Sequence, residues 1–216
     1  MAMQKITCIS DLHRQQNFIK LTKGNVLVIA GDYDILGNLE QCVSLTYGFM
    51  EWIEEVKKKF NHIILIAGNH DIGLEHYPIK GMLTRIQNCY YLQNSGITID
   101  GVKYWGSPIT PTFMDWAFMK DRGTQLKRHW TMIPEDTEVL ITHGPAFGIL
   151  DKCPNGSLGD QDLLNRIKEL PNLKAHIFGH IHESYGKVKK GKITFVNASV
   201  LNGNYVMTNK PIRISI

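Results

Sequence analysis

Val26-Leu-Val-Ile-Ala-Gly-Asp32 indicates the fold class most directly, because an unbroken apolar run ends in a glycine and a carboxylate. Five consecutive apolar residues without polar alternation are typical of a strand that is covered on both faces. Residues 5–9 and 63–67 repeat this order, and they precede Ser10-Asp11 and Gly68-Asn69. A polar loop after each buried strand indicates an α/β fold, with a site at the carboxyl ends of its strands.

The segments around these strands complete an α/β pattern. Between residues 39 and 60, apolar residues recur at steps of three and four, which predicts a helix. Beyond residue 90 the chain is richer in β structure, and Asp100-Gly101 is a hairpin signal. The other expected elements are a hairpin over 97–105, a helix within 120–129, strands over 139–142 and 175–178, a helix over 159–170 capped by Asp160, and strands over 193–196 and 211–214.

Size and composition fit an ordinary globular protein. The chain has 216 residues, of which 43% are hydrophobic and 20% charged, so we expect one domain over residues 1–216. A net charge of +4 suits a phosphate-bearing substrate without requiring a nucleic-acid partner. The densest basic stretch, residues 187–192, is interpreted as a solvated hairpin tip with Gly191 in its turn. No apolar stretch is long enough to span a bilayer, so no membrane partner is expected.

The four cysteines indicate a reducing compartment. Cys8, Cys42, Cys89 and Cys153 are scattered and form no C-x-x-C pair, which argues against a disulfide framework or a zinc knuckle. Reduced thiols are typical of the cytosol. The first residues run directly into a predicted strand without the pattern of a signal peptide, so the expected location is cytoplasmic.

Most of the chemically interesting side chains follow directly after predicted strands. They are Asp11 and His13, then Asp32, then Asn69 and His70, then His143, and finally His180 and His182. Carboxylates, imidazoles and amide oxygens are ligands for divalent metals. Each motif alone is also an ordinary turn or cap, and Gly179-His-Ile-His182 is the strongest because residues two apart on a strand share a face. Together they predict a metal centre in which a shared carboxylate such as Asp32 bridges two ions.

Five motifs, taken in order, resemble those of the calcineurin-like metallophosphoesterases. They are Asp11-x-His13, Gly31-Asp32, Gly68-Asn-His-Asp71, Thr142-His-Gly144 and Gly179-His-x-His182. Further stretches, including Trp105-Gly-Ser-Pro108, Phe178-Gly-His-Ile-His-Glu183 and Phe195-Val-Asn-Ala-Ser199, are similar to one branch, the metallophosphoesterase-domain-containing or class III-like phosphodiesterase proteins. The resemblance implies a four-layer α-β-β-α sandwich with a dimetal site at the carboxyl ends of the strands.

The resemblance also implies a role for each motif residue. One metal would be held by Asp11, His13, Asp32 and His182, and the other by the bridging Asp32 with Asn69, His143 and His180. His70 would contact the scissile phosphate and help the leaving oxygen depart, and Asp71 would orient His70. Asn69, His70 and Arg14 are the expected substrate contacts, although a surface role for Arg14 is equally compatible with the sequence. Mn²⁺ is the first expectation for the metals, with Fe, Zn, Ni or Mg as alternatives.

One stretch departs from the family pattern. The superfamily usually reads Gly-Asp-x-x-Asp, often followed by Arg, whereas this chain reads Gly31-Asp-Tyr-Asp-Ile35. The second carboxylate therefore comes one position early, at Asp34. Because the missing carboxylate is not a usual metal ligand, the departure concerns substrate contacts and the support around the site.

The expected reaction is hydrolysis of a phosphodiester by in-line attack of a dimetal-bound hydroxide. The sequence has neither a Gly-x-Ser-x-Gly motif nor a P-loop, so no covalent enzyme intermediate is required. The expected partner is a small phosphorylated substrate, with a nucleotide first and a cyclic nucleotide as one candidate. Tyr33, Trp105, Phe113 and Trp116 are available to stack on a base, although core packing is expected for at least half of them.

Several alternatives stay open at this point. Within enzymes they are a phosphomonoesterase and a nuclease. In another class, the chain is a non-catalytic nucleotide-binding or scaffold protein, against which the complete ligand set argues. No stable nucleic-acid partner is expected, and the sequence leaves the oligomeric state open.

Overall fold

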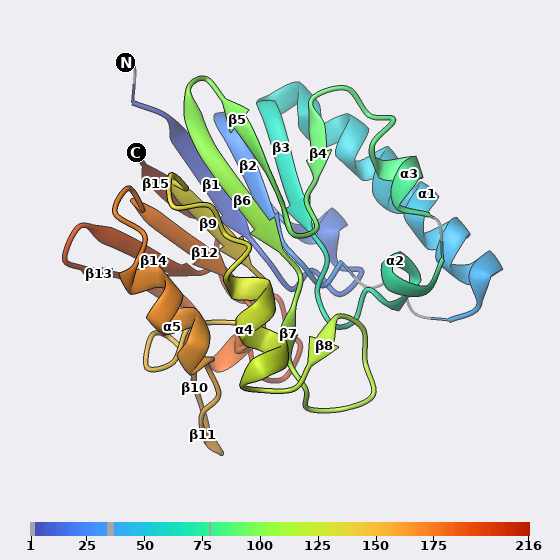
Figure 1. Cartoon of the computed structure of the whole chain (residues 1–216). Helices are drawn as coiled ribbons and strands as arrows, with labels where there is room; N and C mark the ends of the chain where they lie inside the picture. Colours follow the sequence, from blue (N-terminus) through green and yellow to red (C-terminus); the bar gives the residue numbers. More distant parts are fainter. Residues whose placement is uncertain (1–2, 34–36, 78) are drawn as a thin grey trace.

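Two β-sheets lie face to face in the computed structural model, which describes residues 3–33, 37–77 and 79–216 (Figure 1). The strand order of the first sheet is β15 (Ile212–Ser215), β1 (Lys5–Ile9), β2 (Gly24–Ala30), β3 (Phe60–Ile66) and β4 (Cys89–Tyr91). The strand order of the second is β13 (Gly186–Lys190), β14 (Ile193–Asn197), β12 (Ala175–Phe178), β9 (Val139–Thr142), β6 (Val102–Ser107) and β5 (Ser95–Ile99). Both sheets are parallel in their centre, and antiparallel strands form one edge of the first and both edges of the second.

Helices cover the outer face of each sheet (Figure 1). On the first sheet they are α1 (Leu39–Val56), α2 (Ile72–His76) and α3 (Lys80–Leu83), and on the second they are α4 (Thr124–Trp130) and α5 (Gln161–Lys168). The remaining elements are the short ladders β7 (Thr110–Pro111) with β8 (Met119–Lys120) and β10 (Lys152–Cys153) with β11 (Gly156–Ser157), and the 3₁₀ turns η1 (Gln16–Phe18), η2 (Lys57–Lys59) and η3 (His182–Ser184). The layers therefore follow the order α-β-β-α that the resemblance implied.

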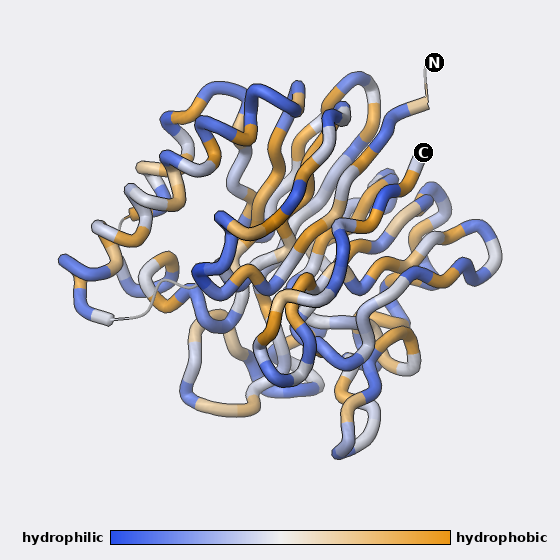
Figure 2. Tube along the Cα trace, turned by 180° about the vertical axis from the view of Figure 1, so that it is seen from behind, coloured by the Kyte–Doolittle hydropathy of each residue, from blue (hydrophilic) through white to orange (hydrophobic). Residues whose placement is uncertain are grey.

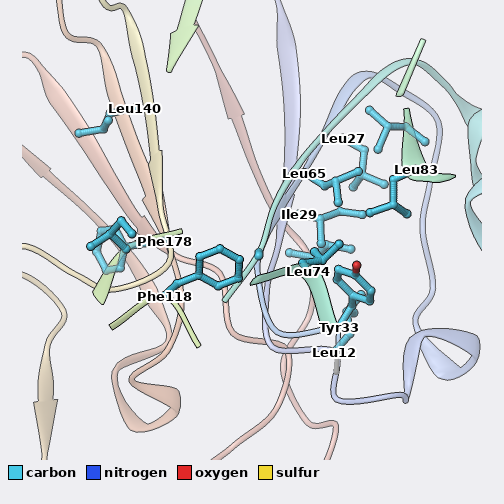
Figure 3. Close-up of a cluster of buried hydrophobic side chains, with 14 of the residues drawn as sticks. Leu12, Leu27, Ile29, Tyr33, Leu65, Leu74, Leu83, Phe118, Leu140 and Phe178 are labelled. Carbon is cyan, nitrogen blue, oxygen red and sulfur yellow. The ribbon is translucent and has the colours of Figure 1, made fainter. Parts of the chain in front are cut away.

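The absence of polar alternation in the central strands follows from these layers. In β2, Leu27 and Ile29 pack in the cluster that contains Phe49 of α1, and Figure 3 shows them beside Leu65 of β3. Val28, between them, packs in the layer between the sheets. Successive residues of a strand point to opposite faces, so both faces of β2 are apolar and buried. Figure 2 shows the same distribution, with apolar residues concentrated along the central strands.

The observed elements agree with most of the predicted ones. Asp160 caps α5, and its carboxylate accepts a hydrogen bond from the backbone N–H of Leu163 at 2.8 Å. The 186–197 hairpin also forms, with Gly191 at a φ of 58° in its turn. No helix of the described residues is long and apolar enough to cross a membrane.

The first helix is shorter than its apolar periodicity suggested. It ends at Val56, the 3₁₀ turn Lys57–Lys59 follows, and Phe60 already belongs to β3. Phe60 is a buried residue of β3. Its position continues the three- and four-residue apolar spacing of the helix only by chance. The sequence did not predict β4, α2 or α3, because elements of three to five residues are too short to show a period.

Candidate metal centre

Sharp turns place the two central carboxylates at the ends of β1 and β2. The backbone N–H of Asp11 donates to the carbonyl of Gly31, and that of His13 donates to the carbonyl of Asp32, each at 3.0 Å. Asp11 and Asp32 both have a φ of 56°, and His13 and His180 have φ values of 37° and 69°. Non-glycine residues adopt this left-handed region rarely, and such strain concentrates at functional sites. The strained backbone at these four residues is therefore in keeping with a functional site at the strand ends.

Two motif glycines let the backbone approach these carboxylates closely. A methyl group on Gly68 would overlap the carboxylate of Asp32, and one on Gly179 would overlap that of Asp11. Only glycine fits where another group occupies the place of the Cβ atom. The Gly-Asn-His-Asp and Gly-His-x-His motifs thus require their first residue for steric reasons.

Three overlapping groups of candidate ligands meet at this point. The groups are Asp11 with His13 and His182, His13 with Asp32 and His70, and Asp11 with Asp32 and His143. Within each group the ligand atoms lie within 4.8 Å of one another. Asp11, His13 and Asp32 each belong to two groups, so adjacent cation positions would share a ligand.

Backbone N–H groups hold the carboxylates in place. Both oxygens of Asp11 accept from the backbone N–H of His180 at 3.1 Å, and Oδ1 of Asp32 accepts from that of His70 at 2.9 Å. The Asp71 carboxylate accepts from the backbone N–H of Asp32 at 2.9 Å and from that of Gly68 at 2.7 Å. Asp71 therefore ties the loop after β2 to the loop after β3.

Main-chain carbonyls orient two of the histidines. Nδ1 of His143 donates to the carbonyl of Ala30 at 2.8 Å, which leaves Nε2 2.9 Å from Oδ1 of Asn69 and 3.2 Å from Oδ2 of Asp32. Nδ1 of His182 donates to the carbonyl of Asn202 at 3.1 Å, which leaves Nε2 3.3 Å from Oδ1 of Asp11. In metal sites, a hydrogen bond from one ring nitrogen of a histidine to a carbonyl commonly orients the other nitrogen toward the metal.

The electrostatics of the buried cluster favour cations. Burial acts to raise the pKa of Asp11, but the charges of His182 and His143 outweigh it and lower that pKa to about 2. Burial likewise opposes ionisation of Asp32, yet His143 holds its pKa well below the usual range. Burial disfavours the charged form of His143, but Asp32 and Asp11 raise its pKa to about 9. Both carboxylates are therefore ionised at neutral pH, and they favour the protonated form of His143.

The residues present fit a pair of divalent cations. Nε2 of His13 is buried 3.6 Å from Oδ2 of Asp32 without a hydrogen bond. Nε2 of His143 faces Oδ1 of Asn69 and Oδ2 of Asp32. A cation that displaced the proton on Nε2 would lie among these three atoms. Burial, and then the charge of His143, lower the pKa of His180 to about 4, so its ring is neutral and can donate a lone pair. Carboxylate, imidazole and amide oxygen together form a donor set for borderline divalent metals.

A cavity of about 420 Å³ opens over this cluster. Asp32, Asn69, His70, His180 and His182 form its floor, and its walls include Phe113, Trp116, Arg122, Leu158 and Tyr205. The His70 ring lies between those of Trp116 and His13, with centroid separations of 4.5 Å and 4.7 Å. A small ligand in this cavity would touch the candidate metal ligands on one side and aromatic rings on the other.

The predicted metal ligands gather at this one place, whereas other predicted residues lie apart from it. Arg14 is exposed and lines a separate hollow along α1, together with Glu51 and Trp52, so its predicted substrate role stays a prediction. Tyr33 is 2% exposed and stacks on Phe49. Trp105 packs against the core, while Phe113 and Trp116 line the cavity. Asp34 and Ile35 lie outside the described residues.

The sequence interpretation missed three residues of the site. Asn202 acts through its main-chain carbonyl, which leaves no signal in a sequence. The Tyr205 ring lies 5.0 Å from those of both His13 and His182, and its position depends on a loop beyond the last motif. Arg122 donates to the carbonyls of Leu158 and Gly159, and these contacts join the β8–α4 connection to the β10–β11 ladder.

Known proteins resemble this chain over most of its length. The family model for calcineurin-like phosphoesterases matches residues 4–184. The chain belongs to the calcineurin-like phosphoesterase family. Its relatives include human metallophosphoesterase domain-containing protein 1, which is 35% identical over 98% of this chain and 71% of that protein. UPF0046 protein K07C11.7 of Caenorhabditis elegans is 36% identical over 94% of this chain and 72% of that protein.

A solved crystal structure shares the fold of this calcineurin-like phosphoesterase. It superposes with a TM-score of 0.67 at 17% identity, over 91% of this chain and 90% of the other. The family and the α-β-β-α fold predicted from the sequence are thereby confirmed. Membership in the family makes the chain a hydrolase of phosphoester bonds, and the acidic and histidine clusters mark it as a divalent-metal protein.

Proposed function

We propose that this phosphoesterase hydrolyses a phosphodiester of a small nucleotide, with a cyclic nucleotide as the first candidate substrate and Mn²⁺ as the first candidate metal. The observation that carries the proposal is the sharing of Asp11 and Asp32 between adjacent ligand groups at the floor of a cavity. Shared carboxylates let two cations lie close enough to act on one phosphate.

In this proposal the two metals use different sets of residues. Asp11, His13, Asp32 and His182 hold one cation, and Asp32, Asn69, His143 and His180 hold the other. When bound, the two cations lower the pKa of a water molecule and neutralise charge on the phosphoryl oxygens. The chain contributes fixed geometry, because main-chain hydrogen bonds orient Asp11, Asp32, His143 and His182 before any ligand arrives.

We assign His70 the role of donating a proton to the leaving group. Its backbone N–H donates to Asp32, while its ring lies at the cavity, against Trp116. That placement keeps the ring beside the metal ligands and within reach of a substrate oxygen. The ring nitrogen would hold a proton for the departing oxygen, and Asp71 supports this arrangement by ordering the backbone around Gly68.

The charges around the cavity favour a diester over a monoester. Among the described residues that line it, the one Lys or Arg is Arg122, whose guanidinium is engaged by Leu158, Gly159 and Asp160. A monoester carries a second negative charge, for which the described lining offers no further free Lys or Arg. A diester carries one charge, and its second ester group would lie along the apolar wall formed by Phe113 and Trp116.

The proposal treats residues 1–216 as a single metallophosphoesterase domain in a reducing compartment, the cytoplasm. Cys8 and Cys89 are buried as free thiols, and burial raises the pKa of both, that of Cys89 to about 12, so these groups remain protonated and unreactive. Such cysteines support a location in which disulfides are not needed.

Hydrolysis of bis-p-nitrophenyl phosphate beside p-nitrophenyl phosphate tests the proposal. Metal-stripped protein with Mn²⁺ restored should cleave the diester preferentially, and Asp32→Ala should abolish this activity. His76→Ala serves as the control for His70→Ala, because the side chain of His76 is 60% exposed. Preference for the monoester would indicate a phosphatase, and no turnover by folded, metal-loaded protein would indicate a binding or scaffold protein.

A second comparison tests the role of His70. Nitrophenolate leaves without receiving a proton, whereas the ribose oxygen of a cyclic nucleotide needs one. His70→Ala should therefore reduce hydrolysis of a cyclic nucleotide by roughly a hundredfold or more, and hydrolysis of the nitrophenyl diester much less. Equal losses on both substrates would contradict the assignment of His70 to the leaving group.

A further inference from the structure

Positive charge is concentrated in two segments of the chain. Residues 12–31 and 184–216 contain nine Lys or Arg residues and no Asp or Glu. In the whole chain the two kinds are nearly balanced, with 24 basic and 20 acidic residues. The remainder of the protein therefore carries a net negative charge. The small overall net charge thus conceals a strong separation of positive from negative charge along the chain.

The fold brings these two segments together at β15, the edge strand of the first sheet. A cavity of about 360 Å³ lies between residues 18–22 and residues 207–213, and Lys20, Lys210 and Arg213 line it. The guanidinium of Arg213 donates to the carbonyl of Lys23, and Nζ of Lys187 donates to the carbonyl of Arg213 at 3.3 Å. These five residues, Lys20, Lys23, Lys187, Lys210 and Arg213, are all exposed and form what we call the basic groove.

The cations of the basic groove have no carboxylate partners among the described residues. The ion pairs of Lys and Arg in the structure involve Lys57, Lys58, Lys103, Arg122, Arg166 and Lys174, all outside the two segments. Arg213 and Lys187 contact main-chain carbonyls, which orient the side chains but leave their charge uncompensated. A surface of this kind concentrates anions.

Protection of the sheet edge does not account for the whole groove. Lysines on edge strands prevent strands of other molecules from pairing, and this explains Lys187 on β13 and Arg213 on β15. Lys20 and Lys23 belong to the connection between η1 and β2, which is not an edge strand. Edge protection also does not require that acidic residues be absent from both segments.

An exposed aromatic ring lies beside these charges. Phe18 lines the groove and is 75% exposed, although aromatic residues of a folded protein are usually buried. A positively charged groove with an aromatic platform is the arrangement that binds single-stranded nucleic acid, because cations follow the phosphates and a base stacks on the ring. We propose that the basic groove binds the backbone of a single-stranded nucleic acid, with one base stacked on Phe18.

Two other polyanions fit the surface less well. An anionic membrane is planar, and several apolar side chains beside the charges strengthen its binding, whereas Phe18 is the one large exposed hydrophobic residue described as lining this hollow. An acidic protein segment would use the charges but not the exposed ring. From the sequence, no stable nucleic-acid partner was expected; the two segments that form the groove meet only in the folded chain.

Fluorescence anisotropy of a labelled 12-nucleotide oligouridylate tests the proposal. The intact protein is used in EDTA, so that no hydrolysis occurs and failure of this proposal leaves the proposed phosphodiesterase activity unaffected. Affinity is measured between 50 and 200 mM NaCl. Lys20→Gln/Lys210→Gln removes two groove charges, and Lys127→Gln/Lys168→Gln removes two exposed lysines from α4 and α5 as the matched control.

The groove variant should bind about tenfold or more weakly than the wild type at 0.1 M salt, with a salt slope that is smaller by about 1.4, while the control variant should bind like the wild type. Phe18→Ser should weaken binding about fivefold or more, and Phe147→Ser, at another exposed aromatic residue, should not. Absence of binding at 50 mM NaCl, or equal losses in groove and control variants, would overturn the proposal. The proposal would also be overturned if poly-glutamate bound as tightly as the oligonucleotide. Binding to phosphatidylserine vesicles without binding to the oligonucleotide would overturn it as well.

Discussion

His182 and Asn202 are joined by a hydrogen bond of 3.1 Å from the ring Nδ1 to the main-chain carbonyl oxygen. Because a carbonyl only accepts, this bond fixes the proton on Nδ1 and turns Nε2 toward Asp11. The Asn202 side chain orders its own loop, since its Oδ1 accepts from the backbone N–H groups of Asn204 and Val206. The loop after β14 therefore sets the direction of a candidate metal ligand that comes from η3.

Tyr205 belongs to the same loop, and we predict that its ring supports metal binding. Its φ is 57°, and asparagine tolerates this conformation, so Tyr205→Asn removes the ring with little strain. The ring contacts both His13 and His182, so we expect Mn²⁺ affinity to fall about tenfold, as measured by calorimetry, with little change in the melting temperature. Tyr205→Phe should retain more affinity than Tyr205→Asn. Unchanged affinity in the Asn variant would show that the ring does not position these histidines.

Metal binding should stabilise the fold through Asp32. With Mn²⁺ at a hundred times its dissociation constant, the wild type should gain about 2.7 kcal/mol and its melting temperature should rise by about 5–10 °C. Asp32→Asn should remove most of this rise, because Asp32 belongs to two of the ligand groups. Asp100→Asn is the matched control, since Asp100 is an exposed turn residue. A full Mn²⁺ shift in Asp32→Asn would contradict its place in the centre.

Two glycine-to-alanine substitutions should have opposite effects. Gly68→Ala places a methyl group against the carboxylate of Asp32, 2.6 Å from Cε1 of His143, so it should lower both stability and metal affinity. Gly48→Ala meets nothing within 4 Å on α1 and should stabilise the protein by about 0.5–1 kcal/mol. Urea unfolding with and without Mn²⁺ measures both effects. The steric argument fails if Gly68→Ala is tolerated as well as Gly48→Ala.

His176 should make the protein lose stability in acid. The Thr142 hydroxyl donates to the carbonyl of Gly144, so Nε2 of His176 must donate to Thr142, and its Nδ1 stays buried without a partner. Burial lowers the pKa of His176 to about 3. The unfolded chain therefore binds one more proton than the folded protein between pH 3 and 6.5, and stability falls as the pH falls through that range.

The substitution His176→Gln tests this dependence, because Gln can donate to Thr142 but does not titrate. Between pH 6 and pH 4, the wild type should lose about 2 kcal/mol more unfolding free energy than the variant. Urea denaturation at several pH values measures the difference. Parallel pH profiles would mean that His176 is not held neutral by the fold.

Arg122 should control the width of the cavity. Its guanidinium donates to the carbonyls of Leu158 and Gly159 at 2.6 Å and 2.9 Å, and it pairs with Asp160 at 3.2 Å. Arg122→Lys retains the charge but loses the planar fork, so we expect KM to rise several-fold with a smaller change in kcat. Hydrogen exchange of residues 152–159 should become faster. Unchanged exchange and KM would show that the β10–β11 ladder keeps its position without this contact.

Most of the longer strands, and the polar motifs that follow them, could be predicted from the sequence. Apolar runs such as residues 26–30 report burial directly, because a strand covered on both faces has no polar alternation. The polar motifs after these runs are short and local, so Asp11, Asp32 and His143 could be predicted as candidate ligands without a structure. Parallel strands bring their carboxyl ends to one edge, which is why residues far apart in the chain could be expected to meet.

How these residues are held, and what surrounds them, depends on contacts that form when the chain folds. Asp11 and Asp32 point at the cluster because both backbones turn left-handed, and the carbonyls of Ala30 and Asn202 select the ring nitrogens of His143 and His182. Arg14, one residue after His13, faces a different hollow for the same reason, since its φ is 64°. The basic groove combines residues from both ends of the chain. Backbone handedness and contacts between distant segments are products of packing, and no local pattern of side chains records them.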